Sequence, residues 1–201
     1  MTRKIRSHSD ELNLALNGGF GGFFELYGDE GVGKTGLLMS MFGHKKGVYV
    51  DLDGTFPSHM VGLMGNNAGS AIIRAPNMSK DDALSLLSSS AQSEADLIVF
   101  DPIGVWDDWA ISDFAAKAHV ICMQSGIHVG VANHCHAAGN SKGDISLQTY
   151  CHVRVEIRNS GEEMPNGMIN NYRIAKNVYG TAGNYGTFTI DFEEMLYEKQ
   201  V

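Results

Sequence analysis

Short hydrophobic runs recur along the first two thirds of the chain, and stretches with helical spacing of hydrophobic positions separate several of them. The predicted strands are 23–27, 47–53, 71–76, 95–101 and 127–134, and the predicted helices are 35–42, 79–91 and 111–125. Strands that alternate with helices predict an α/β fold, with a mainly parallel central sheet and helices on both faces.

The last third of the chain has a different pattern. Residues 152–158, 171–177 and 185–192 alternate between hydrophobic and polar side chains, and turns rich in Gly and Asn separate them. This pattern predicts strands that form a C-terminal antiparallel extension of the sheet.

Length and composition limit the architecture. A chain of 201 residues, of which 43% are hydrophobic, can bury one full core, so we expect a single domain over residues 1–201. Residues 1–10 are expected to form a flexible basic tail. The chain has 15 Lys and Arg against 23 Asp and Glu, a net charge of −8, which argues against a general basic surface for nucleic acid. Any contact with DNA is therefore expected to be local.

Cysteine usage and hydrophobic run length bear on the compartment. Cys122, Cys135 and Cys151 are an odd number without the spacing of a disulfide framework, which is typical of a reducing cytoplasm. The N-terminal residues do not resemble a signal peptide, and no apolar run is long enough to span a bilayer. We expect a cytoplasmic protein with no membrane partner.

One motif carries specific chemistry. Residues 28–35 read GDEGVGKT and match the phosphate-binding pattern G-x-x-x-x-G-K-[ST] at each fixed position, between a predicted strand and a predicted helix. Backbone N–H groups of such a loop can approach phosphates closely because glycine has no side chain. The residues expected to bind the nucleotide are Gly28, Asp29, Glu30, Gly31, Val32, Gly33, Lys34, Thr35 and Gly36.

Three side chains give this motif its expected cofactors, ATP and Mg²⁺. Lys34 is expected to pair with the β- and γ-phosphates, and the Thr35 hydroxyl to ligate Mg²⁺. Asp101 ends a hydrophobic predicted strand, where an acid would hold the same ion directly or through water.

Six segments resemble the RecA family of recombinases and follow the order found there. They are 18–38 (GGFGGFFELYGDEGVGKTGLL), 48–57 (VYVDLDGTFP), 96–101 (DLIVFD), 129–134 (VGVANH), 151–158 (CHVRVEIR) and 173–177 (RIAKN). They are spread over residues 18–177, which is most of the chain, and the chain looks similar to the minimal RecA and UvsX-like proteins of phages. The resemblance implies the fold of a RecA-type P-loop NTPase.

The same resemblance implies catalytic roles beside Lys34. Asp53 matches the glutamate that positions or deprotonates the attacking water, although its side chain is one methylene shorter. Asp51 is the less favoured candidate, and its alternative role is to hydrogen-bond a nearby loop from the end of its strand. His134 stands where the family has a glutamine that senses the γ-phosphate, with an ordinary loop histidine as the alternative.

Two further positions are carried over from the family. Lys176 matches a lysine that reaches the neighbouring subunit's nucleotide, and Val178 stands where the family has a second lysine. The alternative for Lys176 is a solvated strand lysine. His59 falls near the family's adenine-stacking tyrosine and is expected to contact the base.

His134, Cys135 and His136 also suggest a zinc site. Neighbouring residues of this kind do not usually surround one ion tetrahedrally, and no partner motif follows them. Zinc is therefore the less favoured interpretation.

The resemblance places DNA-binding loops at 102–113 and 135–146. Trp106 and Trp109 in the first could stack on bases, but packing or a subunit interface is the favoured interpretation. The second contains one cation, Lys142.

Some charged residues argue against DNA binding by these loops, and others favour DNA binding elsewhere in the chain. Asp107, Asp108 and Asp113 would repel a DNA backbone unless they face elsewhere. The N-terminal Arg3, Lys4 and Arg6 could contact phosphates, and the alternative for them is a solvated tail.

The sequence therefore predicts a recombinase of RecA type that binds single-stranded DNA, in strand exchange or annealing during DNA recombination and repair. We expect slow, DNA-dependent ATP hydrolysis at an intersubunit site, self-association into a filament or ring, and possible recombination partner proteins. One alternative is a ring helicase motor of the same fold. The other is a non-motor ATP-binding mediator that loads a true recombinase.

Overall fold

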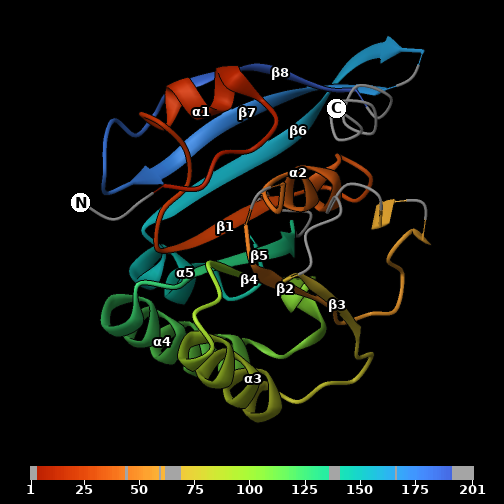
Figure 1. The fold of residues 1–201 in the computed structure, drawn as a ribbon. Helices are drawn as coiled ribbons and strands as arrows, with labels where there is room; N and C mark the ends of the chain where they lie inside the picture. Colours follow the sequence, from red (N-terminus) through yellow and green to blue (C-terminus); the bar gives the residue numbers. More distant parts are fainter. Residues whose placement is uncertain are drawn as a thin grey trace.

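A computed structural model describes residues 4–43, 45–58, 60–61, 69–135, 141–165 and 167–191. Within these residues, eight strands form one sheet in the order β3-β2-β4-β5-β1-β6-β7-β8 (Figure 1). The strands are β1 (Phe23–Gly28), β2 (Gly47–Asp51), β3 (Ala71–Arg74), β4 (Leu97–Asp101), β5 (His128–His134), β6 (Val153–Met164), β7 (Gly167–Asn177) and β8 (Tyr185–Asp191). The strands from β3 to β6 are parallel, and β7 and β8 are antiparallel to their neighbours.

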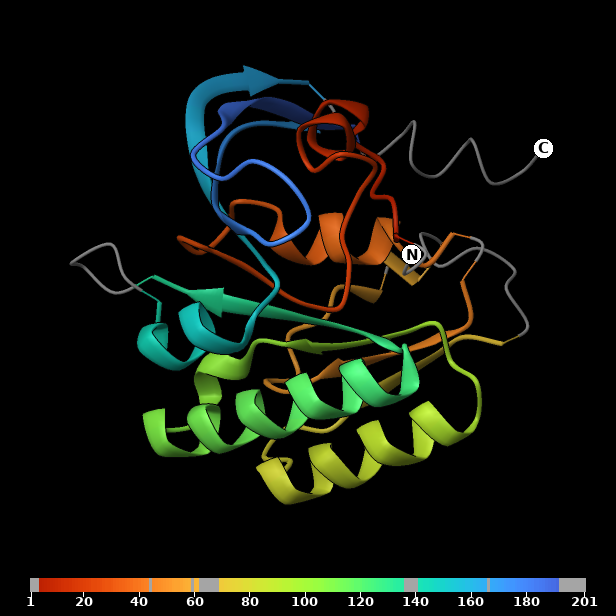
Figure 2. The ribbon, with the colours of Figure 1, turned by 90° about the vertical axis from the view of Figure 1, so that its left-hand side faces the viewer.

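Helices cover both faces of this sheet, as Figures 1 and 2 show. They are α1 (Asp10–Ala15), α2 (Lys34–Ser40), α3 (Lys80–Gln92), α4 (Asp108–Ser125) and α5 (Asp144–Tyr150), with a 3₁₀ turn, η2 (Ile103–Val105). α1 and α2 pack on one face around Leu12 and Leu38, and α3 and α4 pack on the other around Leu87 and Phe114. The predicted α/β fold with a mainly parallel sheet is confirmed. None of the described helices is both long and apolar enough to cross a membrane.

The antiparallel extension begins one strand later than the sequence predicts. Residues 152–158 were expected to belong to it, but β6 pairs in parallel with β1 and antiparallel only with β7. The reason is α5, which connects β5 to β6 along the chain and returns it to the edge where the parallel strands begin. Residues 135–146 were expected to form a loop, so the helix that begins at Asp144 and the crossover that it makes were not predicted.

The expected flexible tail at residues 1–10 is wrong for the residues that the structure describes there. Ile5 is 1% exposed and exchanges backbone hydrogen bonds with Phe20. Ser9 caps α1 by accepting a hydrogen bond from the Leu12 N–H, and the Lys4 ammonium donates to the Leu16 carbonyl at 2.7 Å. Hydrophobic burial of Ile5 holds this segment on the core. Arg3 lies outside the described residues.

Two buried histidines hold the start of β1. The Gly22 N–H donates to Nδ1 of His128 at 2.9 Å, and the Phe23 N–H donates to Nδ1 of His152 at 3.0 Å. The His152 ring also stacks on His119, with centroids 4.8 Å apart. Burial lowers the pKa of His152 below its ordinary value, and the nearby charges of His119 and Lys176 lower it further.

This geometry predicts a loss of stability in mild acid. Because the folded-state pKa of His152 is depressed, the unfolded chain binds more protons below about pH 6.5, and the free energy of unfolding should decrease as the pH falls. His152→Asn keeps an acceptor oxygen near Nδ1 but does not titrate. Urea unfolding between about pH 8 and about pH 5.5 should show a shallower pH slope in this variant, by up to about 1.4 kcal/mol per unit. An unchanged slope, equal to that of the control His8→Asn, would contradict the assignment.

Candidate functional site

A pocket of about 360 Å³ lies at the carboxyl end of the parallel strands, where ligands bind in open α/β sheets. Residues 30–36 line it, together with Asp53, Asp101 and His134, which follow or end three different strands. A larger cavity of about 580 Å³ lies at the β6–β7 hairpin, among side chains such as Met164. The smaller pocket combines a lysine, a hydroxyl and carboxylates, so it is the candidate site.

Glycine conformation shapes the loop that leads into this pocket. Gly31 and Gly33 both have φ of +77°, a left-handed conformation that favours glycine. A Cβ atom on Gly33 would also lie 2.6 Å from the Ile190 side chain. Gly33, which the motif fixes, therefore lets the loop turn tightly against β8, and Gly31, at a variable position of the motif, provides a second left-handed turn.

Lys34 is the first residue of α2, and its side chain folds back onto the preceding loop. Its side chain is buried, and Nζ donates to the carbonyl oxygens of Gly28 at 3.1 Å and Asp29 at 2.6 Å. Burial lowers the pKa of Lys34, and the charge of Asp101 opposes this effect. A desolvated ammonium at the wall of a pocket is well placed to pair with an anionic ligand.

Thr35 and Asp101 meet behind this lysine. The Thr35 hydroxyl donates to Oδ2 of Asp101 at 2.7 Å, and the Tyr49 hydroxyl donates to the same oxygen at 2.5 Å. Burial raises the pKa of Asp101, while the two hydroxyl hydrogen bonds lower it.

This oxygen pair fits Mg²⁺, which accepts few protein ligands and takes the rest from water and phosphate. Among the described residues, no group of three or more His, Cys, Asp and Glu side chains could hold a metal. A magnesium ion here would therefore depend on Thr35, Asp101 and oxygens from its ligand. The less favoured zinc site is not tested in full, because His136 lies outside the described residues.

The two carboxylates after β2 have different surroundings. Asp51 is 2% exposed and accepts hydrogen bonds from the Gly54 N–H at 2.9 Å and the Phe56 N–H at 3.2 Å. Its alternative role, a strand-end carboxylate that holds a nearby loop, is confirmed. Asp53 is exposed, lines the pocket and accepts hydrogen bonds from the Thr55 N–H and hydroxyl. Asp53 is thus the carboxylate that a ligand could reach.

His134 lines the pocket at the end of β5, as expected, but the structure does not bring every predicted residue there. The Lys176 ammonium donates to the carbonyls of Gln148 at 2.7 Å and Thr149 at 3.0 Å, at the C-terminal end of α5. Lys176 is therefore half-buried and hydrogen-bonded within its own chain, and its role at a neighbouring subunit stays a prediction. His59 lies outside the described residues.

Comparisons with known proteins do not assign a family to the chain. No protein-family model matches it, and no curated protein matches it. The convergence of Lys34, Thr35, Asp53, Asp101 and His134 on one pocket therefore carries the functional argument.

The first predicted DNA loop, 102–113, is largely ordered into η2 and the start of α4. Trp106 is 8% exposed, packs against Phe100 and Phe114, and donates from Nε1 to the Met78 carbonyl, so it belongs to the core. Trp109 is 70% exposed, and the Lys80 ammonium lies 4.6 Å from the centre of its ring. Trp109 alone of this pair could meet a ligand.

The acidic residues of this segment have partners within the protein, although Asp107 and Asp108 are exposed. Asp107 accepts from the Ala110 N–H at the start of α4, Asp108 accepts from the Gly143 N–H, and Asp113 pairs with Lys80 and Lys117. Lys142, the one cation of 135–146, donates to the Gly104 carbonyl at 2.9 Å. Residues 136–140 lie outside the described residues. The two predicted loops are thus bonded to each other.

Sequence reasoning missed a pair of exposed arginines on β6 and β7. Arg158 and Arg173 both donate from Nε to the buried Glu156 carboxylate, at 2.6 Å and 2.7 Å, and their side chains are 65% and 60% exposed. Tyr185 on β8 is the register partner of Arg173 and is 85% exposed. The alternation of HVRVEIR, which places every second residue on one face, was the available signal.

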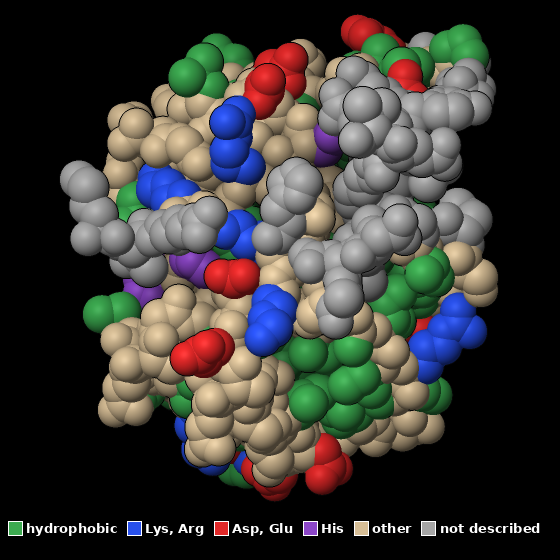
Figure 3. Space-filling model, viewed as in Figure 1, with side chains coloured by type: hydrophobic (Ala, Val, Ile, Leu, Met, Phe, Trp, Pro, Cys, Tyr) green, Lys and Arg blue, Asp and Glu red, His purple; other side chains and the backbone are tan. Residues whose placement is uncertain are grey.

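Elsewhere, the charges are dispersed. On the face shown in Figure 3, the described Lys and Arg side chains lie scattered among acidic ones and form no continuous basic patch.

Proposed function

We propose that this chain is a RecA-type ATPase that binds single-stranded DNA and acts in strand exchange or annealing. The observation that carries the proposal is the meeting of Lys34, Thr35 and Asp101 in one pocket behind the GDEGVGKT loop. An ammonium beside a hydroxyl and carboxylate pair is the donor set that a magnesium-bound nucleotide needs.

Each residue has a distinct role in this proposal. Lys34 pairs with the β- and γ-phosphates, and Thr35 and Asp101 hold Mg²⁺, which when bound neutralises phosphate charge. Asp53 orients or deprotonates the attacking water, for which its exposed carboxylate at the pocket is suited. His134 contacts the γ-phosphate from the end of β5.

The arginine pair supports the DNA part of the proposal. Arg158 and Arg173 present guanidinium groups to solvent, and Tyr185 offers a ring face beside them. Guanidinium groups bind phosphate, and aromatic rings stack on unpaired bases without sequence preference.

One alternative has a specific observation in its favour. Lys176 is bonded to α5 of its own chain, so it would have to leave that position to complete a neighbour's site. A mediator that binds ATP without turning it over would have no such need. The recombinase remains our proposal because Asp53 and His134 both reach the pocket.

The deciding experiment is the steady-state rate of ATP hydrolysis with and without single-stranded DNA, with Lys34→Ala as the blank. A rise with DNA would support the recombinase. A rate at the level of the blank under both conditions, together with measurable ATP binding, would favour the mediator.

A substitution on the exposed sheet face tests the DNA surface. Arg173→Gln keeps a donor for Glu156 but removes one positive charge, so binding to a fluorescent oligothymidine should weaken. The slope of log affinity against log salt should also become shallower by about 0.7. The control is Lys117→Ala, which removes another exposed, ion-paired cation, on α4. Equal salt slopes for Arg173→Gln and the wild type would place DNA elsewhere.

A further inference from the structure

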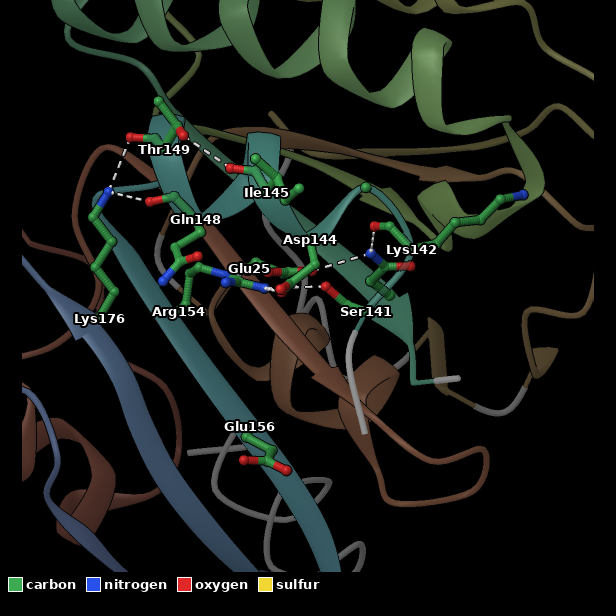
Figure 4. A network of polar contacts seen from close by, with 12 residues as sticks. Glu25, Ser141, Lys142, Asp144, Ile145, Gln148, Thr149, Arg154, Glu156 and Lys176 are labelled. Carbon is green, nitrogen blue, oxygen red and sulfur yellow. Dashed lines mark hydrogen bonds and ion pairs between the residues drawn. The ribbon is translucent and has the colours of Figure 1, made fainter. Parts of the chain in front are cut away.

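Arg154 on β6 joins three elements of the fold (Figure 4). Its side chain is 4% exposed, and Nε donates to Glu25 of β1 at 2.6 Å. Nη2 donates to Asp144, the first residue of α5, at 2.6 Å and to the Ser141 hydroxyl at 3.0 Å. One guanidinium therefore fixes the start of α5 against the central strand.

The same network reaches the wall of the pocket by two short paths. Glu25 accepts from Nδ2 of Asn133 at 3.1 Å, and Asn133 precedes His134, which lines the pocket. The Arg154 guanidinium also lies 4.9 Å from the ring centre of Tyr27, the residue before Gly28. The Gly28 carbonyl in turn accepts from Lys34.

Charged contacts hold α5 at both ends. Asp144 pairs with Arg154 at the N-terminal end, and Lys176 donates to carbonyls at the C-terminal end. Arg154 and Lys176 are register partners on β6 and β7, so both contacts originate from one place in the sheet. Ion pairs depend on orientation more than apolar packing does. A small shift at the end of β1 would therefore change the ion pair between Arg154 and Asp144 at the start of α5.

We propose that Arg154 is a positioning residue that couples occupancy of the pocket to the order of α5, through Glu25 and Asp144. The proposal rests on the proposed function, because the ligand that occupies the pocket is the nucleotide. The path runs through described residues and does not need residues 136–140. Coupling between sites is reciprocal, so a partner bound at the exposed Ile145 of α5 would change nucleotide affinity by the same factor.

Hydrogen exchange tests this coupling without relying on turnover. In the wild type, saturation with Mg²⁺ and the slowly hydrolysed analogue ATPγS should slow amide exchange in 141–150 by about fivefold or more. Asp144→Asn removes the charge that faces Arg154, at a residue whose side chain is 29% exposed, so the fold should survive. In this variant the analogue should still bind but should no longer slow exchange in 141–150.

The control is Ser146→Ala, which removes a hydrogen bond from α5 to Ser112 and leaves Arg154 untouched. Ser146→Ala should keep the slower exchange that ATPγS causes. Asp144→Glu, which retains the negative charge, should keep part of it. If Asp144→Asn only raises exchange equally with and without nucleotide, its role is structural and the proposal is overturned. A wild type that binds ATPγS in equilibrium dialysis without slower exchange in 141–150 would overturn the proposal but spare the nucleotide site. A wild type that does not bind ATPγS would overturn both.

Discussion

Lys34→Ala is expected to lower the rate of ATP hydrolysis by about 100- to 1,000-fold, the usual cost of removing one preorganised donor from a developing charge. Lys34 is the buried cation at the wall of the pocket, and its ammonium now donates to two carbonyls of its own loop. Alanine leaves no positive charge for the γ-phosphate. The rate should be measured at saturating Mg-ATP, with ATP binding measured separately by equilibrium dialysis.

Two controls separate chemistry from folding. Lys117→Ala removes an exposed lysine outside the pocket and should hydrolyse ATP at the wild-type rate. Urea unfolding should show that Lys34→Ala still folds, since its lost hydrogen bonds go to loop carbonyls. A folded Lys34→Ala protein with wild-type turnover would show that the 28–35 loop is not the site of hydrolysis.

Arg154→Met is expected to lower the free energy of unfolding by about 3–5 kcal/mol, the range found when one partner of a buried ion pair is removed. Methionine would leave the Glu25 carboxylate without its positive partner in an interior where Glu25 is 0% exposed. Burial already raises the pKa of Glu25, and Arg154 is the main group that opposes this effect. Urea unfolding measures the loss.

Adding Glu25→Gln should recover much of this stability, because the second substitution removes the unpaired charge and keeps an acceptor for Asn133. The pH dependence has a definite sign. Without Arg154, Glu25 should have a raised pKa in the folded state, so the folded chain binds more protons and the loss in Arg154→Met should be smaller at about pH 5.5 than at about pH 8. Equal losses in the single and double variants, at both pH values, would contradict a buried ion pair.

Local patterns in the sequence predict most of the architecture. Ser79 before a helical stretch marks the start of α3 and does cap it, since its hydroxyl accepts from the Asp82 N–H. The direction of β6 could not be predicted, because it depends on the short helix α5 in a glycine-containing segment with weak periodicity. Trp106 and Trp109 likewise look equivalent in sequence, but one is buried in the core and the other is exposed.

Part of the candidate site and of the contacts behind it could likewise be predicted from the sequence, and part could not. Motif spacing predicts Lys34 and Thr35, because both belong to one contiguous loop. Glu25 and Arg154 lie 129 positions apart. Glu25 alone reads as a polar residue in an otherwise hydrophobic strand, and Arg154 as one polar position of an alternating strand. Only the parallel pairing of β1 with β6 makes them neighbours. Contacts of this kind follow from topology, which local propensity does not determine.

The carboxylate of Glu156 has a consequence for any ligand of the exposed sheet face. Because it anchors both Arg158 and Arg173, the two guanidinium groups are held at a set separation before a ligand arrives. The rotational freedom that isolated arginines lose on binding is already reduced here. The sheet therefore presents two positive charges at a fixed spacing. We expect it to select ligands by the spacing of their negative groups more than by their base sequence.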